Sequence, residues 1–130
     1  MNTISIEIQD CFAKSDIFTV SSDYHSASIQ HHYNNIKKFK KLDERSITKD
    51  DYEKILKAFM DVNFNAVFNE NPDLIGADGW TLICSIENGT SRISIAVWCP
   101  EKDLSKPETL KLIEACELVC PVLDIEKEAP

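Results

Sequence analysis

The stretch that decides the fold is residues 80–99, which read WTLICSIENGTSRISIAVWC. Apolar and polar residues alternate on both sides of Asn88-Gly89, a dipeptide that strongly favours the type I′ turn of a two-residue hairpin loop. Such a loop predicts that the numbers of paired residues add up to the same value as 88 and 89, which is 177. The resulting pairs are Ile86 with Ser91, Cys84 with Ile93, Leu82 with Ile95 and Trp80 with Val97. The sequence therefore predicts a β-hairpin with one apolar face.

Four shorter segments before the hairpin also alternate between apolar and polar residues. They cover residues 3–9, 17–20, 27–33 and 37–42. The last of them is rich in lysine, which suits a strand at the edge of a sheet. Together with the hairpin, these segments predict an antiparallel β-sheet of about five to six strands, with one apolar face and one polar face.

Two amphipathic helices are predicted, at about residues 49–62 and 106–120. Thr48 precedes the first helix as an N-cap, and the apolar residues that follow recur at helical spacing. Ser105 and Glu108 fit a capping box at the start of the second helix, which Pro121 ends. Residues 69–79, between the first helix and the hairpin, contain proline and glycine among acids and predict a loop.

Turns rather than crossover helices connect the predicted strands, so the predicted fold class is α+β. Both helices are expected to pack on the apolar face of the antiparallel sheet, which leaves the opposite face polar and open. The length of 130 residues suits a single domain, residues 1–130, with an acidic tail from about residue 122 that we expect to be mobile.

The net charge of −8 is concentrated in the second half of the chain. Residues 66–130 hold 12 acidic and 5 basic residues, whereas residues 1–65 hold 10 and 9. A negative field repels nucleic acid and speeds the encounter with a basic partner, although solubility alone is an alternative reason for acidity. No segment reaches the roughly 20 apolar residues of a membrane span, and the N-terminus lacks the pattern of a secretion signal. We therefore expect a cytoplasmic protein that does not bind nucleic acid directly.

Among the side chains that often act as nucleophiles or zinc ligands, the sequence has three histidines and five cysteines. His31 and His32 are adjacent, so on a strand they point to opposite faces and cannot serve one site. Three cysteines fall on apolar stripes and are expected in the core as free thiols: Cys84, Cys116 and Cys120. Cys99, where the hairpin ends, is the candidate exposed thiol. Common phosphate-binding, metalloprotease and nucleophile-elbow motifs are missing from the sequence, so we predict no catalytic residue, no metal site and no cofactor.

The remaining candidate site is a surface for a protein partner. The polar face of the hairpin carries Ile83, Arg92 and Trp98 among small polar residues, and tryptophan and arginine are common interface anchors. An alternative for Trp98 is that its indole folds over the sheet edge. Acidic residues that flank the hairpin in sequence are expected to form a rim that steers a basic partner: Glu70, Asp73, Asp78, Glu101 and Asp103.

The start and the end of the hairpin resemble a pattern found in small bacterial immunity proteins. The similar residues are Asp78-Gly79-Trp80 before the first strand and Val97-Trp98-Cys99-Pro100 before the last helix. Such immunity proteins belong to contact-dependent growth inhibition and related polymorphic toxin systems. Asn63-Phe64-Asn65 and Val67-Phe68 are also similar, so that the likeness covers about residues 48–120.

The resemblance implies that the protein binds a cognate toxin domain in the cytoplasm, one toxin per chain, and neutralises it by occluding its active site. It also implies that the toxin is a nuclease, and a basic one, and it brings no catalytic residues to this chain. Two alternatives stay open. One is a non-catalytic adaptor or homodimeric structural protein that uses the open sheet face, and the other is an enzyme that uses Cys99 or a histidine.

Overall fold

The computed structural model describes residues 2–12, 14–35, 37–72 and 79–122. Within these ranges the chain forms six strands and three helices. The strands are β1 (Asn2–Asp10), β2 (Ser15–Ser22), β3 (Ala27–Asn35), β4 (Lys38–Ile47), β5 (Trp80–Asn88) and β6 (Ser91–Trp98). The helices are α1 (Lys49–Met60), α2 (Phe64–Glu70) and α3 (Pro107–Glu117).

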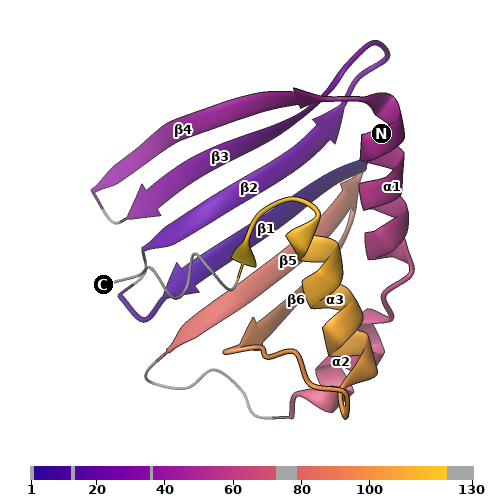
Figure 1. Ribbon diagram of the computed structural model, residues 1–130. Helices are drawn as coiled ribbons and strands as arrows, with labels where there is room; N and C mark the ends of the chain where they lie inside the picture. The colour runs from indigo at the N-terminus through magenta and orange to yellow at the C-terminus, as the bar shows by residue number, and fades with distance from the viewer. Residues whose placement is uncertain (1, 13, 36, 73–78, 123–130) are drawn as a thin grey trace.

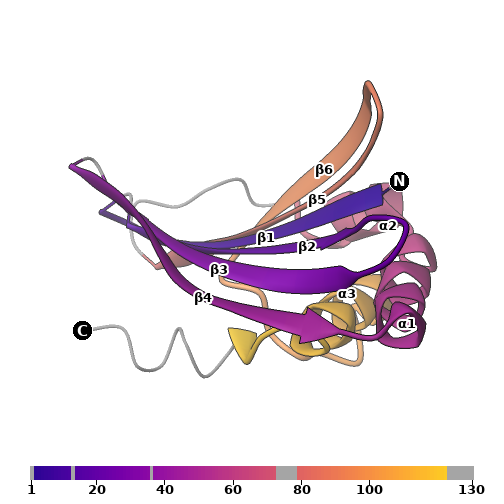
Figure 2. The same ribbon diagram turned by 90° about the horizontal axis from the view of Figure 1, so that it is seen from above.

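All six strands belong to one antiparallel sheet with the order β4-β3-β2-β1-β5-β6 (Figure 1). The lysine-rich strand β4 lies at one edge, as predicted, and β6 lies at the other. Figure 2 shows the three helices on the same face of the twisted sheet, and no other element of the described residues covers the opposite face, here called the uncovered face. The α+β class, the antiparallel sheet and the single covered face are therefore confirmed. None of the described helices is long and apolar enough to cross a membrane.

The hydrophobic core lies between the sheet and the helices. Ile6, on the central strand, pairs with Phe18 on β2 and with Cys84 on β5, and all three side chains are buried on the helix-covered face. Phe59 of α1 and Leu112 of α3 are almost fully buried against this layer. Burial of one such side chain contributes about 1.5–3 kcal/mol to folding, which explains why the alternation in the sequence determines the faces of the sheet.

The hairpin of β5 and β6 has the predicted faces, but the predicted register is wrong by two residues. Asn88 pairs with Ser91, so paired numbers add up to 179 rather than 177, and the two loop residues are Gly89 and Thr90. Gly89 has a φ of 62° and Thr90 does not have a positive φ, whereas a type I′ turn needs two positive values. Glycine at the first loop position suits a type II′ turn instead. A shift of two residues keeps every side chain on its predicted face.

The helix count of two is corrected to three, because α2 was not predicted. α1 ends at Met60, near the predicted end, and Thr48 caps it as predicted by accepting a hydrogen bond from the Asp51 amide (3.0 Å). Asn63 is the N-cap of the next helix. Its side chain caps α2 by accepting a hydrogen bond from the Ala66 amide (3.1 Å), so helical structure continues into the segment that was predicted as a loop from residue 69.

The predicted capping box of the last helix is also wrong. The Ser105 hydroxyl donates to Asp103 Oδ1 (2.7 Å) and does not cap α3. Glu70, at the end of α2, takes this role because its carboxylate accepts hydrogen bonds from the amides of Glu108 (3.1 Å) and Thr109 (2.8 Å). Just beyond the other end of α3, Arg45 of β4 donates to the Val119 carbonyl (3.1 Å). Both ends of the helix are therefore held by residues from distant parts of the chain.

Candidate partner-binding face

The uncovered face of the sheet is the candidate site, and the strand registers arrange its side chains in rows that cross all six strands. The central row has an acid at the middle of the sheet with one isoleucine on each side of it. From β6 to β4 its members are Ala96, Ile83, Glu7, Ile17, His32 and Lys41. Ile17 and Ile83 are both only partly buried, so the middle of this face presents apolar surface around a carboxylate.

The rows on the two sides of the central row differ in chemistry. One row consists of small hydroxyl and longer polar side chains: Ser94, Ser85, Ser5, Thr19, Gln30 and Glu44. The other row ends in an aromatic residue on each edge strand: Trp98, Thr81, Gln9, Ser15, Asn34 and Phe39. Three of the short side chains are themselves buried: Ser15, Thr81 and Ser85. The aromatic side chains at the rim are exposed, and such residues are typical anchors.

Phe39 was not among the predicted site residues, although it is one of the most exposed aromatic residues on this face. Its side chain is 65% exposed and its ring stacks on that of His32, with centroids 4.9 Å apart. In the sequence it stands alone among lysines, and that pattern predicted only an edge strand. The β3 to β4 pairing explains the cluster, because Phe39 lies diagonally across from His32.

The three residues predicted for the hairpin part of the site all lie on the uncovered face. Ile83 pairs with Glu7 and Ala96. Arg92 is exposed and forms an ion pair with Glu87 on the neighbouring strand (3.5 Å). Trp98 is 37% exposed, and its indole lies close to Gly79, where an added Cβ would be 3.1 Å from Nε1. The indole therefore leans over the start of β5 while one part of it still faces solvent.

Two of the five acids predicted for the rim take part in hydrogen bonds at or near the start of α3. Glu70 accepts from the amides of Glu108 and Thr109, and Asp103 accepts from the Ser105 hydroxyl in the loop before the helix. Burial alone would raise the pKa of Glu70, but hydrogen bonds from Thr109 and Glu108 outweigh it and lower that pKa. Glu101 is exposed, and Asp73 and Asp78 lie outside the described residues.

The charge of the uncovered face is close to neutral, in contrast to the net charge of the chain. Its charged side chains in the rows and at the hairpin are Glu7, Glu44, Glu87, Lys41 and Arg92. Lys41 is paired with Glu44, and Arg92 with Glu87. Glu7 differs from the other two acids, because no hydrogen bond or ion pair within the described part of the chain engages its carboxylate.

His31 and the buried thiols contact other side chains of the fold. His31 lies on the helix side, stacks on Phe18 (4.2 Å) and contacts Asp16 (2.8 Å between Nε2 and Oδ1), so it points away from His32 as predicted. Cys84 and Cys116 are buried with their sulfurs 3.4 Å apart. Desolvation raises the pKa of the Cys116 thiol well above its usual value and that of Cys120 to about 12. Among the residues that the structure describes, no group of three possible metal ligands occurs.

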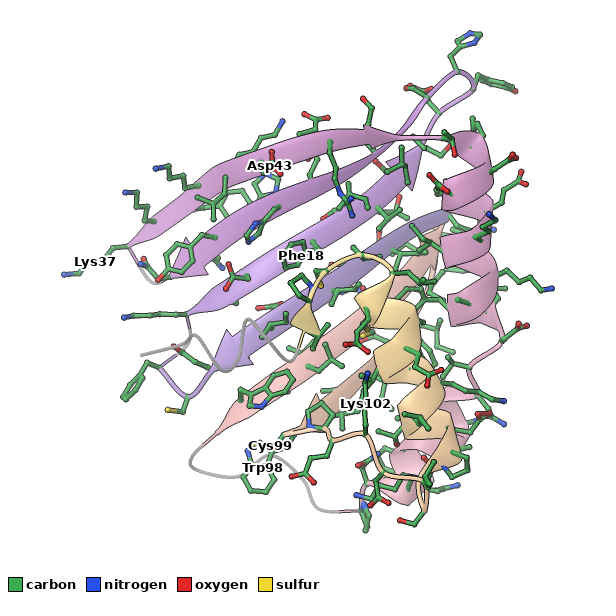
Figure 3. The ribbon with its side chains drawn as sticks, viewed as in Figure 1. Phe18, Lys37, Asp43, Trp98, Cys99 and Lys102 are labelled. Atoms are coloured by element: carbon green, nitrogen blue, oxygen red, sulfur yellow. The ribbon has the colours of Figure 1, made fainter. Side chains whose placement is uncertain are left out.

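The five cysteines are free thiols, and Cys99 is not the most exposed of them. Cys11 is exposed, whereas Cys99 is half-buried at the end of β6. Figure 3 shows Cys99 beside Trp98 where the hairpin opens. The Cys99 amide donates to the Trp80 carbonyl (2.8 Å), and its sulfur would be 2.4 Å from a Cβ on Gly79. Gly79, Trp80, Trp98 and Cys99 thus form one packed junction, which explains why these residue types occur together at the two ends of the hairpin.

No protein-family model matches the chain, and a search of curated proteins finds no sequence that is significantly similar to it.

Proposed function

We propose that the protein is an immunity protein, a non-catalytic inhibitor that binds a cognate bacterial toxin domain in the cytoplasm and occludes its active site. The uncovered face of the sheet is the binding surface in this proposal. The observation that carries it is the central row, in which Glu7 lies between Ile17 and Ile83 at the middle of six strands. A wide exposed face with apolar side chains at its centre and aromatic ones at its rim is typical of a surface that a partner covers.

Glu7 is the residue that we expect to attract a cation of the partner. Its carboxylate has no partner within the described residues, and the side chains on both sides of it are apolar. When a partner covers this face, the carboxylate loses water and needs a cation to replace the lost hydration. A lysine or arginine of a basic toxin supplies that cation, and the net charge of −8 adds a long-range negative field that speeds the encounter.

The experiment is a binding assay between the purified protein and the toxin domain encoded by the neighbouring reading frame. Isothermal titration calorimetry is expected to show one toxin per chain, and addition of the protein is expected to abolish the toxic activity. Glu7→Lys places a cation where a cation must bind, and we expect it to weaken the affinity by roughly a hundredfold, since loss of a buried charge partner costs about 2–5 kcal/mol.

The matched control is Glu53→Lys, the same change at an exposed acid of α1 on the helix side. It alters the net charge equally and is expected to change the affinity much less. If the toxin does not bind, the proposed function is wrong. If Glu53→Lys is as harmful as Glu7→Lys, the toxin does not use the uncovered face.

A further inference from the structure

The two edge strands of the sheet protect their exposed edges very differently. β4 carries six charged residues among ten and has a bulge opposite the His31/His32 step, two features that discourage another strand from pairing. β6 reads SRISIAVW, and Arg92 is its only charged residue. The structure gives β6 no bulge against β5. An edge strand without a bulge and with little charge is a template for the addition of a further strand.

The backbone of β6 has hydrogen-bonding groups that point away from the sheet. The bond from the Cys99 amide to the Trp80 carbonyl shows that odd-numbered residues of this strand face β5, because bonded and non-bonded pairs alternate in antiparallel ladders. The N–H and C=O groups of Arg92, Ser94 and Ala96 therefore point outward, and all three residues are exposed. No hydrogen bond within the described part of the chain reaches these groups.

An apolar side chain accompanies this open edge on the helix side. Ile93 is 53% exposed, although its cross-strand partner Ile86 is buried. Phe68, also exposed, belongs to α2, the helix that packs against β6. A strand added beyond β6 would cover Ile93 and would satisfy the outward backbone groups at the same time.

We propose that the added strand is β6 of a second copy of this chain, paired antiparallel about a two-fold axis perpendicular to the sheet. Outward groups come only from even-numbered residues, so paired numbers must add up to an even value. Two registers pair the largest number of β6 residues. In these registers the numbers of paired residues add up to 188 or to 190. In the first, Ser94 faces itself and Arg92 faces Ala96. In the second, Ser94 faces Ala96 and Arg92 faces Trp98.

The sequence of β6 suits this self-pairing. Arg92 does not face its own copy in either register, so no like charges lie opposite each other, and Ile93 faces an apolar residue, Ile95 or Val97, in both. Antiparallel pairing also keeps equivalent faces together. The two uncovered faces therefore join into one continuous surface, and the helices of both copies lie on the other side. In such an isologous contact both copies use the same surface, so the assembly is complete with two copies. This is the two-fold symmetry that is commonest among soluble oligomers.

The first experiment measures the mass of the purified full chain by light scattering over a series of concentrations. We expect a dimer, and a monomer at every concentration would overturn the proposal. Ser94→Lys puts a charge on the β6 edge without touching the core and is expected to give a monomer. Ser46→Lys is the matched control, an exposed serine on the same face of the other edge strand, and should leave the dimer intact. The opposite result for the two variants would overturn the proposal.

A second experiment reads the register by disulfide formation in a Cys11→Ser background, which removes the exposed native thiol. Ser94→Cys is expected to cross-link with itself if the sum is 188. A mixture of Ser94→Cys and Ala96→Cys chains is expected to cross-link with each other if the sum is 190, because facing Cα atoms lie within disulfide range. Absence of both products, or cross-linking of Ser46→Cys instead, would show that β6 is not the contact. None of these results depends on the identity of a toxin.

Discussion

Replacement of Glu70 tests how the last helix is held in place. The Glu70 carboxylate accepts hydrogen bonds from the amides of Glu108 (3.1 Å) and Thr109 (2.8 Å) and from the Thr109 hydroxyl (2.7 Å). Lys106, the residue at the N-cap position, makes no side-chain cap bond of its own. Glu70→Ala therefore removes the side-chain cap of α3 and one charged acceptor for the hydroxyl of Thr109, whose side chain is almost fully buried.

The expected loss of stability in Glu70→Ala follows from the hydrogen bonds that the substitution removes. Loss of an N-cap costs about 1 kcal/mol, and loss of a hydrogen bond to a charged group adds at least about 1 kcal/mol. Asn71 does not replace the lost acceptor, because its side-chain amide donates to the Thr109 hydroxyl oxygen (2.8 Å). We expect Glu70→Ala to lower the free energy of unfolding by about 2 kcal/mol and Glu70→Gln, which keeps an acceptor oxygen, by about 1 kcal/mol. Urea denaturation monitored by circular dichroism measures both values.

The pH dependence of stability is a second test of the capping role of Glu70. The pKa of Glu70 is lowered from 4.5 in the folded protein, so its stabilising contribution is fully present above pH 4.5 and is lost as the pH falls below that value. The difference between wild type and Glu70→Gln should therefore shrink on acidification. Glu114→Ala, an exposed acid on α3, is the control and should cost less than about 0.5 kcal/mol. An equal loss in both alanine variants, or a difference that does not change with pH, would refute the capping role.

Further changes test the hairpin and the thiols. Gly79→Ala should destabilise the protein more than Gly89→Ala, because both positions have positive φ (95° and 62°) but only at Gly79 would the new Cβ meet the Cys99 sulfur, at 2.4 Å. We expect about 1–2 kcal/mol for Gly89→Ala from the left-handed backbone alone. Cys99→Ala should recover part of the Gly79→Ala loss in urea denaturation, and no recovery would contradict the clash. A thiol-reactive dye should label Cys11 quickly in the native protein and the buried core thiols only after unfolding: Cys84, Cys116 and Cys120. Rapid labelling of all five would disprove this burial.

The sequence predicts the faces of the sheet better than its registers, for a physical reason. Alternation of apolar and polar residues determines which side of a strand is buried, and this survives a shift of two residues, as in the β5 to β6 hairpin. The register depends on the turn, and Gly89 can serve as the second residue of one turn type or the first of another. The choice between them is made by packing across strands.

The missed features share a different cause. α2 is seven residues long, and its N-cap, Asn63, is equally suited to ending the preceding helix. The cap of α3 comes from Glu70, 38 residues before Glu108, and local sequence around Ser105 gives no sign of it. The stack of Phe39 on His32 likewise depends on strand pairing. Contacts between distant residues require the fold before they can be inferred.

The place of β1 at the centre of the sheet has a consequence for folding order. β1 to β4 pair with their neighbours in sequence and form a meander from local contacts, as β5 and β6 do by themselves. The two parts join only when β1 pairs with β5, which brings together residues as far apart as Asn2 and Asn88. Because such long loops close slowly, we expect an intermediate in which β1 still has a free edge. Cooling during expression should favour its productive closure over aggregation.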